Sequence, residues 1–291
     1  MDQITKNAKA KINLGLDVIR RRPDGYHEVK MIMQTVGIWD VLRITKASEA
    51  GIRITANDTA KNDQVPIDQN NLIYKAASML MNAYPDKIQG VQIHLDKNIP
   101  VAAGMAGGST DAAATFTGMN ELFDLKLTMQ ELMAMAVKIG ADVPYCILGG
   151  TALSEGIGEI LTPIMSPPQC YLVIAKPDLF ISTKYVYENL KLTEDTRHPD
   201  IDGIHKAIEN QDLDVMAEKL ENLLETVTET EYPVIATLKE MMKQEGALNA
   251  LMSGSGPTVF GIFKSKGEAE QALNTVRGSG LAKQVFLTTF A

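Results

Sequence analysis

A glycine-rich stretch at residues 100–114, PVAAGMAGGSTDAAA, carries the strongest chemical signal in the chain. Glycine lets backbone N–H groups approach an anion closely, and a helix start adds roughly half a positive charge. The hydroxyls of Ser109 and Thr110 stand at the expected helix start, where they suit a phosphate oxygen or a magnesium ion. An ordinary helix cap accounts for Ser or Thr there, but not for three glycines and three alanines in the nine preceding residues. The stretch therefore predicts a phosphate-binding loop.

Other motifs for phosphate binding or hydrolysis are absent from the sequence. A Walker A loop needs Gly-Lys followed by Ser or Thr, and no Gly-Lys pair occurs in the chain. The GxGxxG spacing of dinucleotide-binding proteins does not occur in the loop. The HRD and DFG motifs of protein kinases and the GxSxG elbow of serine hydrolases are also missing. The loop therefore belongs to another class of phosphate-binding protein.

Composition and charge describe a globular protein that binds small ligands. Of the 291 residues, 45% are hydrophobic and 22% are charged, which is close to the globular average and argues against disorder. The net charge is 28 minus 36, or −8, so the chain lacks the basic footprint of a general nucleic-acid binder. Local dipoles can still hold a small anion inside an acidic protein.

Cysteine content and the N-terminus predict a cytoplasmic protein. Cys146 and Cys170 are the only cysteines, and no Cys/His cluster predicts a structural zinc site. The polar start MDQITKNAKAK has no apolar core typical of a signal peptide. The longest uncharged run, residues 246–263, contains four glycines and Pro257, which argues against a membrane helix. We expect neither a nucleic-acid partner nor a membrane partner, and either a monomer or a homodimer.

The elements around the loop follow from hydrophobic periodicity. Alternation at residues 12–18 predicts a half-buried strand, with Lys11 and Asn13 on its polar face. Asn70 and Asn71 are both positioned to cap a helix that ends near residue 84. Thr128 begins a capping-box helix that ends near residue 140. We also expect a turn at 21–25, strands at 29–36, 41–44, 52–55 and 91–95, and a helix at 109–123.

The second half of the chain alternates helices and strands around a proline-rich boundary at residues 162–169. Helices are predicted at 183–190, 213–224, 233–245 and 267–277, and strands at 171–175, 247–252, 258–263 and 283–289. The mixed order predicts an α+β protein of two layered domains, residues 1–162 and 163–291.

Three stretches, in order and spanning nearly the whole chain, resemble the motifs of the GHMP kinases. The loop at 100–114 resembles their second motif, KINL at 11–14 their N-terminal motif, and LMSGSGPTVF at 251–260 their C-terminal glycine motif. The resemblance implies an ATP-binding N-terminal domain like domain 2 of ribosomal protein S5. It also implies a ferredoxin-like C-terminal domain that binds substrate, with ATP and substrate meeting between the two.

Four shorter stretches are similar to one branch of this superfamily. They are AKINL at 10–14, RPDGYH at 22–27, GADVP at 140–144 and EGIGE at 155–159. Members of the branch act in the non-mevalonate pathway of isoprenoid synthesis. The resemblance implies ATP- and Mg²⁺-dependent transfer of a γ-phosphate to a tertiary hydroxyl of a cytidine-diphosphate sugar alcohol.

The resemblance assigns the catalytic roles to two residues. Asp142, in GADVP, matches the aspartate that takes the proton of the acceptor hydroxyl, whereas a lone Asp in a turn is more often bonded to local backbone. Lys11 matches the lysine that pairs with it and stabilises charge on the transferring phosphoryl group. Without the resemblance, Lys11 is a solvated strand lysine, and its neighbour Lys9 is an equal candidate.

Binding residues follow from the same motifs. For the nucleotide they are Pro100, Val101, Ala102, Ala103, Gly104, Met105, Ala106, Gly107, Gly108, Ser109, Thr110, Asn71 and Lys97, with Ser109 as the candidate magnesium ligand. For the substrate they are Asn13, Tyr26, His27, Thr183, Tyr187, Gly254, Ser255 and Gly256. A tyrosine stacks on a pyrimidine and a histidine reads its edge. Structural alternatives remain: Asn71 or Thr183 as a helix cap, Tyr187 as a core residue, and 254–256 as a hairpin turn.

Three positions depart from the usual pattern. Ala106 stands where glycine is usual, so a positive φ there would be strained. Thr110 replaces serine and keeps the hydroxyl, and Lys184 replaces a small residue or proline. Two other functions stay open: a GHMP kinase acting on another alcohol, such as homoserine or mevalonate, and a non-catalytic ligand sensor of the same fold.

Overall fold

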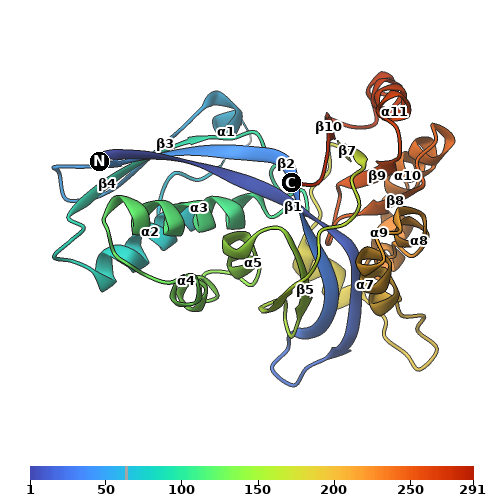
Figure 1. Cartoon of the computed structure of the whole chain (residues 1–291), viewed down its shortest axis with the longest axis horizontal. Helices are drawn as coiled ribbons and strands as arrows, with labels where there is room; N and C mark the ends of the chain where they lie inside the picture. Colours follow the sequence, from blue (N-terminus) through green and yellow to red (C-terminus); the bar gives the residue numbers. More distant parts are fainter. Residues whose placement is uncertain (63–64) are drawn as a thin grey trace. The chain divides into compact units, whose positions relative to one another are not determined.

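The computed structural model describes residues 1–62 and 65–291, with side chains for 1–60 and 65–291 (Figure 1). The chain forms two compact units. The first consists of Met1–Ala10, Ile38–Val101 and Ala106–Gly149, and the second of Lys11–Gly37, Ala102–Met105 and Gly150–Ala291. Two long strands, β1 (Gln3–Arg21) and β2 (His27–Lys46), contribute residues to both units. The domain boundary after residue 162 stays a prediction.

The first unit is a sheet covered by helices. Strand β3 (Gly51–Ala56) runs parallel to β4 (Gly90–Asp96), and β4 pairs antiparallel with residues 41–46 of β2. Helices α2 (Leu72–Ala83) and α3 (Gly107–Leu122) lie side by side against these strands (Figure 1). The unit also contains α1 (Asp58–Asn62), α4 (Met129–Ala136) and α5 (Val143–Leu148). Leu42, Ile93, Leu80 and Phe116 belong to the core between strands and helices.

The second unit is built on an antiparallel sheet of order β10-β7-β9-β8. These strands are β7 (Tyr171–Lys176), β8 (Asn249–Met252), β9 (Val259–Phe263) and β10 (Gln284–Thr288). Helices α10 (Val234–Gln244) and α11 (Lys266–Gly278) pack on them. The unit also holds β5 (Thr151–Glu155), β6 (Ile160–Pro163), α6 (Thr183–Asn189), α7 (Ile201–Glu209), α8 (Leu213–Glu218) and α9 (Glu225–Glu231). Over the described residues, no helix has the length and apolar character of a membrane span.

The predicted mixture of helices and strands is confirmed, and so are two predicted caps. Asn71 caps α2 through a bond from the N–H of Ile73 to its side-chain oxygen. Thr128 and Glu131 form both bonds of the capping box that begins α4. The predicted strands at 29–36 and 41–44 are a single strand, β2.

The strand predicted to be half-buried is buried on both faces between residues 10 and 18, so that prediction is wrong. Part of the cause is α7, whose isoleucine side chains pack against Gly15 so closely that a Cβ there would stand 2.6 Å from Ile204 Cδ1. The polar side chains of the strand find partners inside the protein. Asp17, for example, lies 2.8 Å from His198 Nδ1.

Two helix predictions also need correction. The helix expected at 213–224 ends as α8 at Glu218, because the backbone at residues 221–223 pairs with Leu16 of β1 instead. The cap of α6 is Ser182, whose hydroxyl accepts from the N–H of Tyr185, and not Thr183. The hydroxyl of Thr183 is engaged elsewhere, 2.8 Å from the hydroxyl of Ser255.

Candidate active site

The glycine-rich loop adopts the left-handed backbone conformation at several positions. Ala102, Gly104 and Ala106 have φ values of 50°, 70° and 56°. The strain expected at Ala106 is therefore present, because side chains with a Cβ are disfavoured in this region. Gly104 cannot be replaced without movement, since a Cβ there would stand 2.1 Å from the carbonyl oxygen of Ser253. The loop is a constrained structure and not a loose connection.

The loop ends at the N-terminus of α3, which is open to an anion. Ala106 begins the helix without a side-chain cap, and the first bond of the helix runs from the N–H of Thr110 to the carbonyl of Ala106. The N–H groups of the residues between them have no partner in the helix. The hydroxyl of Thr110 donates to the carbonyl of Lys9, so Thr110 fastens the helix, and Ser109 is partly exposed at its start. This end of α3 has the form of a phosphate-binding site.

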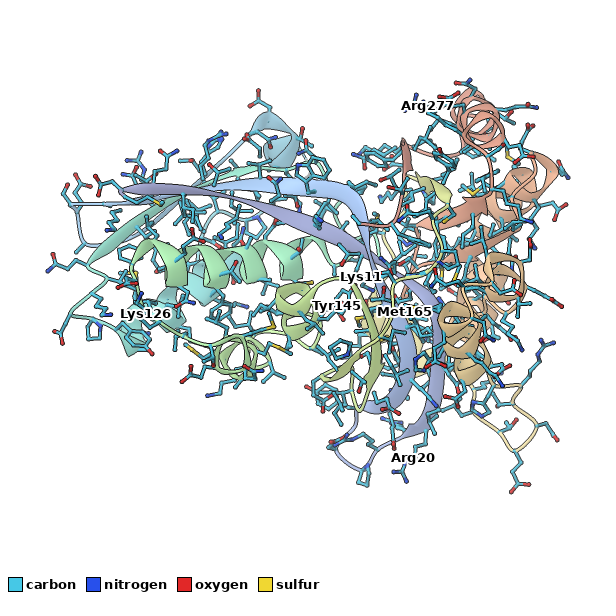
Figure 2. All side chains as sticks on the ribbon, in the orientation of Figure 1. Lys11, Arg20, Lys126, Tyr145, Met165 and Arg277 are labelled. Atoms are coloured by element: carbon cyan, nitrogen blue, oxygen red, sulfur yellow. The ribbon has the colours of Figure 1, made fainter. Side chains whose placement is uncertain are left out.

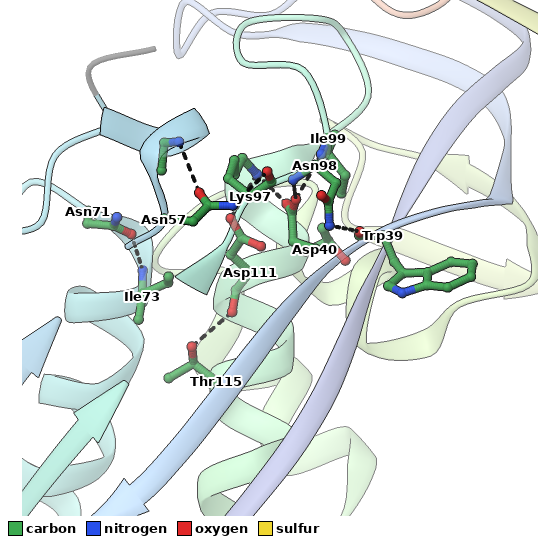
Figure 3. A network of polar contacts seen from close by, with 12 residues as sticks. Trp39, Asp40, Asn57, Asn71, Ile73, Lys97, Asn98, Ile99, Asp111 and Thr115 are labelled. Atoms are coloured by element: carbon green, nitrogen blue, oxygen red, sulfur yellow. Dashed lines mark hydrogen bonds and ion pairs between the residues drawn. The ribbon is translucent and has the colours of Figure 1, made fainter. Parts of the chain in front are cut away.

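Lys97 lies in a buried ion network behind this helix start (Figure 3). Its ammonium contacts the carboxylates of Asp40 on β2 and Asp111 on α3, the latter at 3.0 Å. Asp40 also accepts from the N–H groups of Asn98 and Ile99, at 2.5 and 2.8 Å. The predicted nucleotide residue Lys97 thus ties α3 to the sheet. A Cβ at the first residue of α3, Gly107, would stand 2.9 Å from the Lys97 ammonium.

The protonation of the network follows from its surroundings. Burial raises the pKa of Asp111 from 3.8 to about 8, and Asp40 adds to this, while Lys97 opposes it. One oxygen of Asp111 has no hydrogen-bond partner among the described residues. Burial opposes the charge of Lys97, but Asp111 and Asp40 outweigh burial and hold the pKa of Lys97 above its usual value. Asp111 therefore holds its proton to a higher pH than an ordinary carboxyl, and Asp40 differs from it in accepting two backbone bonds.

This assignment predicts opposite outcomes for two similar substitutions. The folded protein holds a proton on Asp111 that the unfolded chain releases. The contribution of this proton to the free energy of unfolding is therefore full below pH 3.8 and is lost as the pH rises through about 8. We expect Asp111→Asn to remove this fall in the free energy of unfolding with rising pH. At neutral pH we expect it to change the free energy of unfolding little. We expect Asp40→Asn to lower the free energy of unfolding by on the order of 3 kcal/mol, because the buried Lys97 loses one of its two carboxylate partners.

Urea unfolding of both variants and the wild type at pH 5, 7 and 9 measures these effects. A wild-type free energy of unfolding that rises between pH 5 and 9, or a larger loss in Asp111→Asn than in Asp40→Asn at pH 7, would contradict the assignment.

Asn71 serves the fold with both ends of its amide. Its oxygen accepts from the N–H of Ile73 at 2.8 Å, and its nitrogen donates to the carbonyl of Pro66 at 2.6 Å. Asn71 is therefore a helix cap, the structural alternative to nucleotide binding. Its proposed contact with the nucleotide stays a prediction.

Asp142 occupies the N-cap position of α5 but does not cap it. Its backbone is helical, with φ −78° and ψ −17°, and its side chain makes no capping bond. Pro144 and the buried Val143 follow at the start of the helix. Asp142 is partly exposed, and among the described residues its carboxylate has no hydrogen-bond or ion-pair partner. The common role of a turn aspartate, bonding its own backbone, is thus not the role of this residue, and its catalytic role stays a prediction.

Lys11 lies on β1 in the second unit and is 5% exposed (Figure 2). Its ammonium donates to the side-chain oxygen of Asn13 at 2.6 Å, and within the described part of the chain no carboxylate pairs with it. A buried ammonium with a neutral partner retains its attraction for an anion. Lys11 and Asn13, which were predicted to share a site, are therefore in contact. The pairing of Lys11 with Asp142 stays a prediction.

The C-terminal glycine loop, residues 253–256, lies against Lys11 and Asn13. The hydroxyl of Ser253 accepts from the N–H of Asn13 at 3.3 Å and donates to the carbonyl of Gly104 at 2.9 Å. A Cβ at Gly254 would stand 3.5 Å from Asn13 Oδ1 and 3.6 Å from Lys11 Nζ. A Cβ would make ordinary contacts there, but the φ of 58° at Gly254 disfavours any side chain. The proposed place of this loop beside the substrate stays a prediction.

Two predicted substrate residues meet at a second place in the same unit. The rings of His27 and Tyr187 lie 5.1 Å apart at an angle of 39°. The preceding turn is fixed by Asp24, which accepts from the N–H of Tyr26 and pairs with Arg22. Tyr26 itself is 61% exposed. These residues supply an exposed aromatic ring and an aromatic pair, as a pyrimidine pocket requires.

The charge state of His27 suits the reading of a base edge. Its partial burial, together with the neighbouring Arg21, lowers the pKa of His27 below its usual value. The imidazole is therefore neutral at pH 7 and offers one donor and one acceptor. Lys184, a departure from the family pattern, is largely exposed and lies 3.8 Å from Glu188, so it makes no buried contact on α6.

Three functional positions escaped the sequence analysis. Asp40 and Asp111 hold Lys97, yet an isolated aspartate gives no sign of burial in a sequence. Ser253 joins three chain segments through one hydroxyl, and its only signal was its place in the SGSG stretch.

Comparison with known proteins places the chain in a family. The model of the GHMP kinases N terminal domain matches residues 71–150, and that of the GHMP kinases C terminal matches residues 204–280. The 4-diphosphocytidyl-2-C-methyl-D-erythritol kinase of Lachnoclostridium phytofermentans is 51% identical over 290 residues, which is 100% of this chain and 98% of that protein. The kinase of the same name from Lachnospira eligens is 51% identical and covers 99% of this chain and 98% of its own.

Solved structures agree with this placement. A crystal structure of 4-(cytidine 5'-diphospho)-2C-methyl-D-erythritol kinase has a TM-score of 0.84 at 30% identity, over 99% of both chains. A homoserine kinase from Cytophaga hutchinsonii has a TM-score of 0.80 at 19% identity, covering 100% of this chain and 95% of its own, and shows the shared fold. The chain therefore belongs to the GHMP kinases and, within them, to the family of 4-diphosphocytidyl-2-C-methyl-D-erythritol kinases.

Proposed function

We propose that this protein transfers the γ-phosphate of ATP to the 2-hydroxyl of 4-diphosphocytidyl-2-C-methyl-D-erythritol, a step in the non-mevalonate synthesis of isoprenoid precursors. The full-length relatives bear the name of this activity. The observation in the structure that carries the choice of acceptor is the contact between the rings of His27 and Tyr187. A neutral imidazole beside an aromatic ring suits a cytosine, whereas homoserine and mevalonate contain no base to occupy it.

ATP binds, in this proposal, with its phosphates at the N-terminus of α3. The N–H groups that have no partner within the helix bind the anion there, and the left-handed backbone at Ala106 begins this helix. Lys97 holds α3 in place through its ion pair with Asp111. Asn71 and Lys97 are the proposed neighbours of the nucleotide base, and their side chains also serve the fold through the contacts described above.

Mg²⁺ enters the proposal as the companion of ATP. The described residues contain no group of three or more His, Cys, Asp or Glu side chains arranged for a metal ion. Ser109, partly exposed at the start of α3, fits an ion that is held mainly by phosphate oxygens and water. When bound, the ion neutralises charge on the phosphates.

The chemical step is a direct transfer without a phosphoenzyme. The proton of the 2-hydroxyl passes to the carboxylate of Asp142, and the oxygen attacks the γ-phosphorus. The bond from that phosphorus to the bridging oxygen breaks, and ADP leaves with its electron pair. Lys11, whose ammonium is buried beside Asn13, stabilises the charge on the transferring group. The reaction takes place in the cytoplasm, and the enzyme is a monomer or a homodimer.

Recognition of the base is tested with CDP as a probe. We expect CDP to compete with the acceptor, and Tyr187→Ala to weaken CDP binding by about 1–3 kcal/mol, the usual contribution of one stacked base. Tyr185→Phe is the matched control, because Tyr185 lies on the same helix and contacts Glu231 instead. Calorimetric titration of the three proteins with CDP measures the difference. Equal CDP affinity in the wild type and Tyr187→Ala would refute a cytidine pocket at this place.

A further inference from the structure

A buried asparagine outside every predicted site holds the C-terminal glycine loop. Asn222 lies between α8 and α9 and is 2% exposed. Its side-chain nitrogen donates to the carbonyls of Met252 and Gly254, both at 2.8 Å. Its side-chain oxygen accepts from the N–H of Leu224 at 3.0 Å. One amide thus fixes the two carbonyls that flank Ser253.

Glu225, three residues after Asn222, holds the backbone N–H of Met252, whereas Asn222 holds its carbonyl. Glu225 accepts from the N–H of Met252 at 2.7 Å through one oxygen. Its other oxygen pairs with the ammonium of Lys239 at 2.7 Å, and Lys239 also contacts Glu229. The backbone N–H and carbonyl of Met252, the last residue before the loop, are therefore both held by the short segment 222–225.

The same segment is attached to the strand that carries Lys11. The N–H of Leu16 on β1 donates to the carbonyl of Glu221 at 3.0 Å, and the N–H of Leu223 donates to the carbonyl of Leu16 at 2.9 Å. Residues 221–225 thus bond to β1 on one side and to the glycine loop on the other. This bridge acts together with the direct bond from the N–H of Asn13 to Ser253 to set the separation between Lys11 and the loop.

The loop has two functional neighbours. Gly254 lies beside Asn13 and Lys11, as described above. The hydroxyl of Ser255 lies 2.8 Å from that of Thr183, the predicted substrate residue on α6. A shift of the loop therefore changes both the surroundings of the Lys11 ammonium and the position of Thr183.

We propose that Asn222 is a positioning residue for phosphoryl transfer. It holds the glycine loop at a fixed distance from Lys11 and Thr183, and it does so through backbone carbonyls without contacting substrate. This inference rests on the proposed function, because Lys11 and Thr183 take their roles from it. Misplacement of a catalytic group by about 1 Å costs on the order of 100-fold in rate.

The test compares Asn222→Ala with Asn249→Ala. Asn249 is the matched control, because its side chain donates to the carbonyl of Ala217 at 2.8 Å in the same unit, and it lies at the end of β8 opposite the loop. We expect both variants to lose similar stability. We expect only Asn222→Ala to lower kcat, by on the order of 10-fold to 100-fold, and to raise the acceptor KM. Amide hydrogen exchange at residues 253–256 should rise in Asn222→Ala alone.

Three outcomes decide the matter. Wild-type kcat in Asn222→Ala, or an equal kcat loss in Asn249→Ala, would overturn the positioning role. Wild-type protein that turns over no acceptor would refute the proposed function separately. In that case, amide hydrogen exchange at residues 253–256 and the CDP affinity of the two variants still test whether Asn222 holds the loop against α6. Exchange and CDP affinity equal to those of the wild type in Asn222→Ala would refute this role.

Discussion

Asp142→Asn is expected to lower kcat by about 10²-fold to 10⁴-fold, the usual contribution of a positioned general base, while ATP still binds. The carboxylate is partly exposed at the head of α5, and no capping bond engages it. Asparagine has the same shape but cannot take the proton of the acceptor hydroxyl. Because no described residue bonds to this side chain, the substitution should leave the unfolding midpoint near that of the wild type.

Single-turnover kinetics and ATP titration of Asp142→Asn make this measurement. The control is Asp212→Asn, since Asp212 caps α8 by accepting from the N–H of Val215, and asparagine caps equally well. We expect the control to retain the wild-type rate. Wild-type turnover in Asp142→Asn would exclude Asp142 as the base and would direct attention to another carboxylate.

Lys11→Met is expected to lower kcat by about 10²-fold to 10³-fold, comparable to the loss of one preorganised electrostatic contact in a buried site. The ammonium is buried beside Asn13, and among the described residues no carboxylate shares its charge. Its attraction is therefore directed to the anion that develops during transfer. Stability should change little, because the lost bond to Asn13 and the relieved burial of a charge oppose each other.

Lys9→Met is the control for this prediction. Lys9 is two residues away on the same strand and is exposed, and no contact among the described residues engages its side chain. Steady-state kinetics of both variants with saturating ATP should show a large loss for Lys11→Met and none for Lys9→Met. The reverse result would show that the lysine of the KINL stretch was wrongly chosen.

Local features of the site were predictable from sequence because they depend on neighbours in the chain. Asn71 and Thr128 cap their helices as expected, and the glycine-rich loop meets a helix start. The strain at Ala106 could be foreseen for the same reason, since it depends on one residue type at one backbone position.

Features that depend on distant partners were not predictable. Lys97 and Asp40 are 57 residues apart, and each alone suggests a solvated charge. The alternation of polar and apolar residues in β1 predicted one polar face exposed to solvent. That face is buried, because α7 and the C-terminal glycine loop cover it. Asn222 fell inside a predicted helix, and its bonds to Met252 and Gly254 span 30 and 32 residues.

The acceptor of this kinase is decided most directly by ADP release. Purified protein with ATP and Mg²⁺ is supplied in parallel with 4-diphosphocytidyl-2-C-methyl-D-erythritol, homoserine, mevalonate and galactose, and ADP release is recorded. We expect turnover with the cytidine substrate alone, with one phosphate added at the 2-hydroxyl. Turnover with homoserine or mevalonate and none with the cytidine substrate would contradict it.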